Sequence, residues 1–287
     1  MKAKNIFYLT LLSFTIMGLL LNSCNRANKT GSLTWILKDG TLTISGQGVM
    51  PNYETAPWDT DKSFITNVVI DYGVKNIGNK AFSGLKSLMM VEIPLTVLSI
   101  GDYAFEGCIG LASIKIPNTV LTIGSHAFEG CKGLISIEIP PLLNVIEEST
   151  FANCESLIFI EIPDGVKSIE KNAFSNCTRL QSVTLGQDLS FIAIGAFRMC
   201  RRISEINSRN TTPPKIEISE DDIISPQENE IIIRGELSPD VNAFEYVSKD
   251  IPVFIPEEAI FAYKTALIWK KFTNFKTTEP VTIFILD

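Results

Sequence analysis

Apolar residues recur along most of this chain with a fixed period of 23 residues. Six phenylalanines keep that step, and they are Phe82, Phe105, Phe128, Phe151, Phe174 and Phe197. Five cysteines stand three positions after a phenylalanine, and they are Cys108, Cys131, Cys154, Cys177 and Cys200. Alanine precedes each phenylalanine except Phe151, which follows Thr150. A period of this length predicts one small structural unit that is repeated in register.

Within one unit the pattern changes from alternation to a compact turn. In Leu111-Ala-Ser-Ile114-Lys-Ile116-Pro117 the apolar residues alternate with polar ones, which predicts a half-buried strand. Proline ends that strand because it cannot donate to a β-ladder. The Ala-Phe-x-x-Cys segment suits a tight turn or a short 3₁₀ segment. Such a unit cannot bury its apolar face alone, so the sequence predicts a β-rich repeat solenoid over residues 65–206.

The segment after the repeats predicts a cap and an insertion. Residues 251–287 are expected to cap the last coil. Glu257 to Phe272 has the pattern of an amphipathic helix, in which the residues expected to be buried are Phe261, Ala262, Ile268, Trp269 and Phe272. Residues 207–250 fit no repeat and are predicted to be an irregular acidic insertion, with an acidic stretch from Glu217 to Asp222 and a hairpin around Ile231 to Ile233.

The I-G-x-x-A-F-x-x-C segments, as in Ile100 to Cys108 and Ile123 to Cys131, resemble the BspA-type leucine-rich repeat of bacterial surface proteins. Leu33-Thr34-Trp35 and Ala56-Pro57-Trp58 are similar to that family's amino-terminal cap, which implies a cap over residues 33–64. Trp269 to Phe272 is similar to its carboxy-terminal cap. The resemblance implies a right-handed superhelix with a β-hairpin cap at one end and a helical cap at the other. Leu85 departs from the pattern in place of a cysteine.

The first residues have the pattern of an export signal. Lys2 and Lys4 precede an apolar run from Ile6 to Leu21, which predicts a signal peptide over residues 1–23. The Leu21-Asn-Ser-Cys24 ending resembles the bacterial lipobox, which implies that diacylglycerol is attached to Cys24. Residues 24–32 are then expected to be a tether. We therefore expect an exported lipoprotein, held at the outer membrane or the cell surface.

The five repeat cysteines are expected to form a row of buried thiols. Neighbouring parallel strands lie about 4.8 Å apart, whereas a disulfide needs Cβ atoms about 3.8 Å apart. Bridging neighbours would strain the stack. A row also diverges along the solenoid axis, so it does not converge on a metal ion.

Candidate chemistry elsewhere is weak, and we expect no enzyme, no cofactor and no metal. His126 is the only histidine, and other units place Lys, Tyr, Ser, Asn or Gly there, which predicts an exposed, unconstrained position. Adjacent Glu147 and Glu148 are expected to point to opposite sides of an extended chain. Glu220-Asp221-Asp222 lacks the spacing of a calcium loop. The formal net charge of −7 argues against nucleic-acid binding.

The remaining candidate for a functional site is the outward side of the predicted strands. The outward positions are Asn67, Val69, Met90, Glu92, Ser113, Lys115, Ser136, Glu138, Phe159, Glu161, Ser182 and Thr184. In-register strands would align them in two columns on an extended face, on which solenoids of this type commonly bind partners. Phe159 is the expected anchor.

We therefore predict a monomeric, non-catalytic protein that binds another macromolecule. The family resemblance implies adhesion, with host matrix proteins or other cells as partners. The alternative is a structural envelope protein without a host partner.

Overall fold

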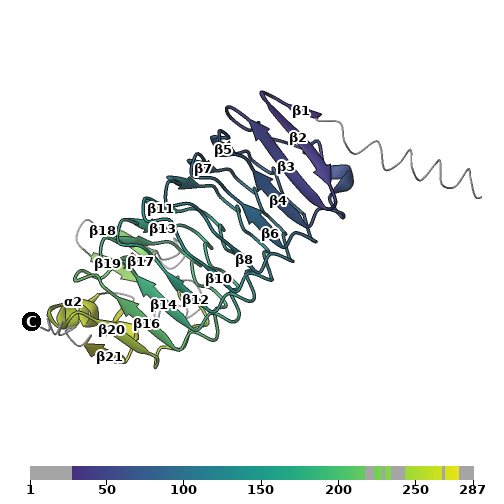
Figure 1. The fold of residues 1–287 in the computed structure, drawn as a ribbon. Helices are drawn as coiled ribbons and strands as arrows, with labels where there is room; N and C mark the ends of the chain where they lie inside the picture. Colours follow the sequence, from purple (N-terminus) through teal and green to yellow (C-terminus); the bar gives the residue numbers. More distant parts are fainter. Residues whose placement is uncertain (1–27, 217–222, 228–229, 234–242, 267–268, 278–287) are drawn as a thin grey trace, which may run out of the picture.

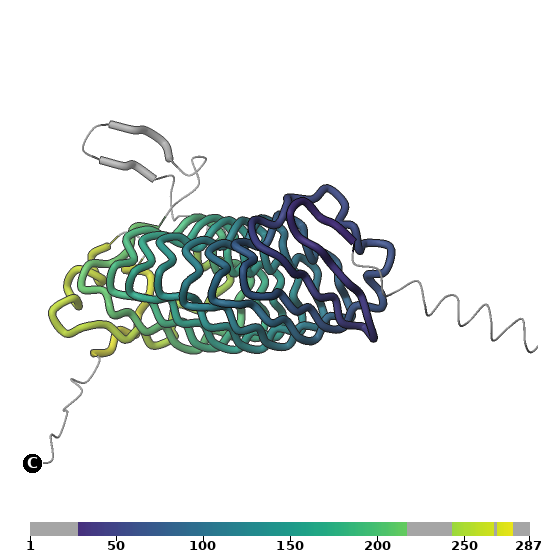
Figure 2. Tube along the Cα trace, turned by 45° about the horizontal axis from the view of Figure 1, so that its top comes forward, coloured from purple at the N-terminus to yellow at the C-terminus, as the bar shows by residue number. Residues whose placement is uncertain are grey.

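The computed structural model describes residues 28–216, 223–227, 230–233, 243–266 and 269–277. The chain winds into a solenoid of about nine turns, built mostly from short strands. Figures 1 and 2 show the coils stacked along one axis, with the β1–β3 end and the α2 end at opposite ends. The predicted repeat solenoid is confirmed.

Most coils contribute one strand to each of two rows of parallel strands. The first row, which we call the strand face, contains β4 (Asn67–Ile70), β6 (Met90–Glu92), β8 (Ser113–Ile114), β10 (Ser136–Ile137), β12 (Phe159–Glu161), β14 (Ser182–Leu185), β16 (Glu205–Ser208), β20 (Pro252–Ile255) and β21 (Asn274–Thr277). The second, which we call the second face, contains β5 (Asn76–Ile77), β7 (Ser99–Ile100), β9 (Thr122–Ile123), β11 (Val145–Ile146), β13 (Ser168–Ile169), β15 (Phe191–Ile192) and β17 (Lys215–Ile216). Partners such as Phe159 and Ser182 lie one repeat apart in sequence, so the coils stack in register.

The first coil is closed by an antiparallel hairpin of β2 (Leu33–Lys38) and β3 (Thr41–Gly46). Its two-residue turn, Asp39-Gly40, has positive φ at both positions, which suits the twist of the flanking strands. A short strand β1 (Asn28–Thr30) pairs with β2, so these residues belong to the cap and not to a tether over 24–32. A 3₁₀ turn, η2 (Asp59–Asp61), follows before the first repeat.

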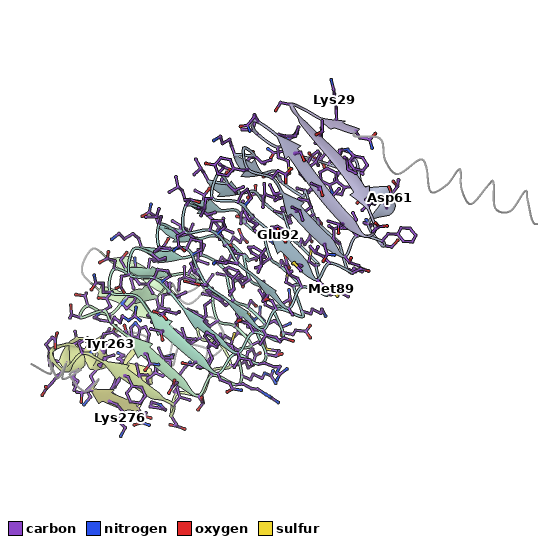
Figure 3. The ribbon with its side chains drawn as sticks, in the orientation of Figure 1. Lys29, Asp61, Met89, Glu92, Tyr263 and Lys276 are labelled. Atoms are coloured by element: carbon purple, nitrogen blue, oxygen red, sulfur yellow. The ribbon has the colours of Figure 1, made fainter. Side chains whose placement is uncertain are left out.

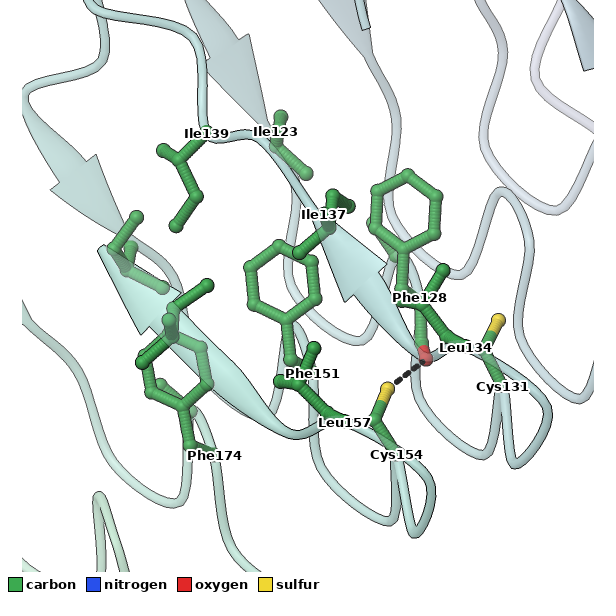
Figure 4. Packing of buried hydrophobic residues seen from close by; sticks show 14 of the residues in the cluster. Ile123, Phe128, Cys131, Leu134, Ile137, Ile139, Phe151, Cys154, Leu157 and Phe174 are labelled. Atoms are coloured by element: carbon green, nitrogen blue, oxygen red, sulfur yellow. Dashed lines mark hydrogen bonds between the residues drawn. The ribbon is translucent and has the colours of Figure 1, made fainter. Parts of the chain in front are cut away.

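Two rows of side chains run through the core (Figure 4). Consecutive phenylalanine rings stack with centroids 5.2–5.5 Å apart from Phe82 to Phe197. Beside them, each repeat cysteine donates its thiol to a phenylalanine carbonyl of the preceding coil, as Cys154 Sγ does to Phe128 O at 3.3 Å. Each coil therefore covers the apolar face of its neighbour and also bonds to its backbone.

Every turn around a phenylalanine contains two residues with left-handed backbone. One lies two positions before the ring, at Lys80, Tyr103, His126, Ser149, Asn172 and Gly195. The other lies two positions after it, at Gly84, Gly107, Gly130, Asn153, Asn176 and Met199. These turns carry the predicted Ala-Phe-x-x-Cys segments. The backbone conformation is thus constant where the residue type varies.

The solenoid continues beyond the repeats that are visible in the sequence. Phe244 stacks on Phe197 at 5.2 Å, and Trp269 follows at 5.4 Å. β17 pairs with β15, and β20 pairs with β16. Residues 207–216 and 243–250 therefore belong to coils, in contrast to the irregular insertion expected over 207–250. Between them lie the antiparallel strands β18 (Ile223–Gln227) and β19 (Glu230–Ile233), in the region of the predicted hairpin, whereas Glu217 to Asp222 lies outside the described residues.

The last coil is covered by a short helix and not by one long helix. α2 (Ile260–Thr265) lies between the 3₁₀ turns η4 (Glu257–Ala259) and η5 (Trp269–Lys271). Trp269 and Phe272 are buried as expected, and Ile268 lies outside the described residues. The expected burial of Phe261 is wrong, since it is 79% exposed, and Ala262 is half-buried. Phe261 lies within α2 but faces away from the core, and the buried residue of that helix is Tyr263.

Among the residues that the structure describes, no helix combines the length and the apolar character needed to cross a bilayer.

Candidate functional site

The strand face presents the outward residues that the alternation predicts. Met90, Glu92, Ser113, Lys115, Glu138, Phe159 and Glu161 are exposed, while Asn67, Val69, Ser136, Ser182 and Thr184 are half-buried. Glu92, on β6, is labelled in Figure 3. Parallel register aligns Phe159 with Ser182 and Glu161 with Thr184. The two predicted columns therefore exist as surface features.

The central part of the strand face is hollowed. A depression of about 560 Å³ lies over β8, β10 and β12, with Ser113 and Ser136 in its lining and Phe159 beside them. Ile114 and Ile137 also line it, although each is buried at 6% exposure. The hollow therefore combines a polar rim with an apolar floor.

Ladder pairing on the strand face is also interrupted at the hollow. β8 and β10 pair only with each other, whereas β12 belongs to the next five-stranded ladder. Each of these two strands contains two residues, in contrast to the four of β14. The regular strands of this face are therefore shortest where the hollow lies.

Charged side chains of both signs surround the hollow. Lys115, Glu138 and Glu161 line it. Arg209 extends over the strand face to form ion pairs with Glu161 and, at 3.4 Å, with Asp164. Within the described residues Lys115 and Glu138 form no ion pair, although they occupy equivalent positions in adjacent coils. Their charges remain available to a partner.

The structure assigns no catalytic constellation to the only histidine. His126 stacks on Tyr103 with centroids 4.5 Å apart, and its Nδ1 bonds to Glu129. The side chain is 23% exposed and the residue has a φ of 59°, so the expectation of an exposed, unconstrained position is wrong. The stack on Tyr103 and the positive φ of this turn position constrain the residue.

Carboxylates do not form a metal centre in the described part of the chain, where no group of three or more His, Cys, Asp or Glu could hold an ion. Glu147 is half-buried and Glu148 is exposed. Burial, together with the negative charges of Glu170 and Asp102, raises the pKa of Glu147. Glu220-Asp221-Asp222 lies outside the described residues.

The five repeat cysteines are free and buried. Burial raises the pKa of Cys131 to about 12 and raises the pKa values of Cys108, Cys154 and Cys177 as well. These thiols therefore stay protonated at neutral pH and lack the thiolate that attacks or binds metals. Cys24, the expected lipid attachment site, lies outside the described residues.

Comparison with known families gives a match to the BspA-type leucine-rich repeat region, in six copies over residues 61–158 and 99–216. The chain belongs to the BspA-type leucine-rich repeat family. The match indicates a protein-binding or surface role for this BspA-type chain. The family is defined by its repeat and not by a reaction. No curated protein matches the sequence.

Three solved structures are similar to this BspA-type protein. A leucine-rich repeat protein of T. pallidum is 30% identical, with 63% of this chain and 81% of that chain covered and a TM-score of 0.48. A Bacteroides ovatus leucine-rich repeat protein is 19% identical, with 88% and 76% covered and a TM-score of 0.43. A leucine-rich cell surface protein of Faecalibacterium prausnitzii is 18% identical, with 64% and 95% covered and a TM-score of 0.34.

Sequence reasoning missed two features of this BspA-type surface. Arg209 was not a candidate, because 48 residues separate it from Glu161 and no repeat position connects them. The seventh stacked ring was visible in principle, since Ala243-Phe244-x-x-Val247 repeats the turn motif with valine in place of cysteine. The insertion before it breaks the fixed period, which hid the motif.

Proposed function

We propose that this chain is a non-catalytic cell-envelope lipoprotein whose strand face binds a protein partner. The observation that carries the proposal is the central hollow, where Phe159 borders an apolar floor formed by Ile114 and Ile137. An aromatic or aliphatic side chain of a partner would find both apolar contact and surrounding charge there. Aromatic anchors in such pockets account for much of the affinity of protein interfaces.

Partners of the expected class are host matrix proteins, in keeping with an adhesive role. Surface plasmon resonance would measure binding of purified collagen, laminin and fibronectin to the immobilised chain from Asn25 onward, which contains every described residue. Phe159→Ser is expected to weaken binding by about 30-fold, because removing an interface anchor costs about 2 kcal/mol.

Phe261→Ser is the matched control. Phe261 is also an exposed phenylalanine, but it lies on α2 at the end of the solenoid. Its replacement is expected to leave binding unchanged. Saturable binding to none of the matrix proteins, or an equal loss in both variants, would reject adhesion through the strand face.

The lipid anchor and the exposure of the protein need separate measurements. Incorporation of labelled fatty acid that is lost in Cys24→Ser would support lipidation, and a chain that remains unlabelled would reject it. Protease treatment of whole cells distinguishes an adhesin from the alternative, a structural envelope protein without a host partner. An adhesin must be cleaved from outside.

A further inference from the structure

The first coils share a ladder of amide and carboxylate side chains on the second face. Asn52 Oδ1 accepts a hydrogen bond from the backbone N–H of Asn79 at 2.9 Å. Asn79 and Asp102 repeat this bond to Asp102 and Ser125, each at 3.0 Å. Each side chain thereby joins its own coil to the next.

This ladder requires glycine in the neighbouring position. A Cβ on Gly101 would lie 2.3 Å from Asn79 Oδ1, and one on Gly124 would lie 2.3 Å from Asp102 Oδ1. Both distances are far below van der Waals contact, so no larger residue fits. The glycines add no side chains of their own to this part of the second face, and a depression lies there.

This depression on the second face ends at the coil where the row of Asn and Asp side-chain bonds ends. In the next coil Glu147 occupies the glycine position, and its side chain closes a depression of about 450 Å³. Ser99 and Thr122 line one side, while Asn79, Asp102 and Ser125 line the other. An adjoining depression of about 360 Å³ shares Asn79 and Asp102 and adds the rings of Tyr53 and Tyr103. We call the two depressions together the polar trough.

The lining of the polar trough selects the chemistry of a ligand. Among its described lining residues the only cation is Lys80, at the outer end, where it pairs with Glu54 at 3.2 Å. An anion would therefore meet Asp102 and Glu147 without a free counter-charge. Asp102 already accepts from the Ser125 backbone N–H through Oδ1 and, at 3.1 Å, from the Asn79 amide through Oδ2. The groups left open are the Glu147 carboxylate, which needs donors, and the Ser99, Thr122 and Ser125 hydroxyls, which serve as either donor or acceptor.

A molecule dense in hydroxyl groups satisfies all of these groups at once. We propose that the polar trough is a binding site for a neutral oligosaccharide, separate from the protein-binding strand face. Hydroxyl donors from the sugar would bond to the Glu147 carboxylate and to the remaining lone pairs of Asp102, and the tyrosine rings would border one end. The half-buried Glu147 carboxylate forms no hydrogen bond to the described residues, so it is open to such a donor.

Isothermal titration calorimetry would test the site with the chain from Asn25 onward. The probes are maltohexaose, cellohexaose, xylohexaose and mannohexaose, together with hexalysine and an anionic chondroitin sulfate hexasaccharide. We expect saturable binding of at least one neutral hexasaccharide with little dependence on salt, because no ion pair is formed. Binding of none of the four, or salt-sensitive binding of hexalysine alone, overturns the proposal.

Two variants locate the binding. Thr122→Lys places a long side chain in the trough without removing a ladder bond, and it is expected to lower affinity by at least about tenfold, the effect of losing about one hydrogen bond. Ser168→Lys, at the equivalent strand position of β13, lies outside the trough and is expected to leave affinity unchanged. Equal loss in both variants, or no loss in Thr122→Lys, contradicts the assignment.

A third variant tests the carboxylate itself. Glu147→Gln keeps the length of the side chain, and no ladder bond involves Glu147. It should therefore unfold at no lower a temperature than the parent chain and bind the sugar about tenfold more weakly, because the charged acceptor is lost. Unchanged affinity would overturn the role of Glu147 as an acceptor.

Discussion

Some residues in the phenylalanine turns have a strained backbone, because the turn requires a positive φ in every coil but the residue there is not always glycine. Ser149 has a φ of 53°, and it occupies a position where another coil has Gly195 with a φ of 70°. A residue with a Cβ is destabilised in left-handed backbone, because its Cβ lies too close to the following carbonyl oxygen. The turn is nevertheless retained, since the stacking of the rings on either side fixes it.

Replacing Ser149 with glycine should therefore stabilise the protein. We expect Ser149→Gly to raise the free energy of unfolding by about 1 kcal/mol in urea titrations, since the strain exceeds the added entropy of the unfolded chain. Glu148→Gly is the control, because Glu148 is exposed and does not have positive φ. It should lower the free energy of unfolding, and a gain in both variants would contradict the argument.

Glu147 gives a prediction for the dependence on pH. Its pKa is raised from an ordinary value of 4.5 by burial and by the charges of Glu170 and Asp102. Ionised Glu147 therefore destabilises the folded state. This cost is absent below about pH 4.5, where the carboxyl is protonated in both states, and it develops as the pH rises through the folded-state pKa.

Glu147→Gln should accordingly stabilise the protein at neutral pH, by about 0.5 kcal/mol because the site is partly exposed to solvent. Thermal unfolding across an acid-to-neutral series is expected to show this gain shrinking as the pH falls. A gain that is constant over the series would indicate that packing, and not ionisation, causes it.

At the scale of the coil, the stacked rings and the buried thiols hold neighbouring turns together. Phe151 lies between Phe128 and Phe174 at 5.5 and 5.3 Å and is fully buried. Phe151→Ala would leave a cavity on both sides and is expected to cost about 3–5 kcal/mol of stability in denaturant unfolding. Phe261→Ala, at an exposed site, should cost almost nothing. Similar losses in both would contradict the stack as a source of stability.

The thiol row predicts a chemical behaviour of the same coils. Each cysteine is buried, and its thiol bonds to a carbonyl of the coil before it. In the chain from Asn25 onward, iodoacetamide at mildly alkaline pH should leave all five cysteines unmodified until denaturant unfolds the coils. Mass spectrometry would report the labelling, and modification of any of them in the folded protein would show that the row opens.

The whole molecule behaves as a linear stack, so its length should be adjustable in steps of one unit. Deletion of residues 157–179 removes one complete coil and joins Ser156 to Leu180, which stands where Leu157 stood. We expect a folded protein with a lower free energy of unfolding, because one coil–coil interface is lost. Circular dichroism with urea titration would measure both properties.

A deletion of residues 157–174 is the control for this prediction. It removes a similar length but shifts all later coils out of register, so strand positions would meet turn positions. This variant should fail to fold cooperatively. Equal stability of the two deletions would contradict a register-dependent stack.

The sequence by itself determined the repeat, the outward columns of the strand face and the buried rows of rings and thiols. Each depends on the residue type at a fixed period. Because the coils stack in register, residues one period apart become neighbours in adjacent coils. Sequence also located the caps, although the boundaries of the last coils and the burial of Phe261 differed in the structure.

Only the tertiary structure decided where surfaces are hollowed and which side chains meet. The strand-face hollow is lined by Ser113 and Ser136 beside Phe159, together with Ile114 and Ile137. The polar trough exists because the Asn79 and Asp102 side chains exclude any Cβ from the coil above. Contacts between coils depend on the volume of each side chain and on the direction in which it points, and the sequence period specifies neither.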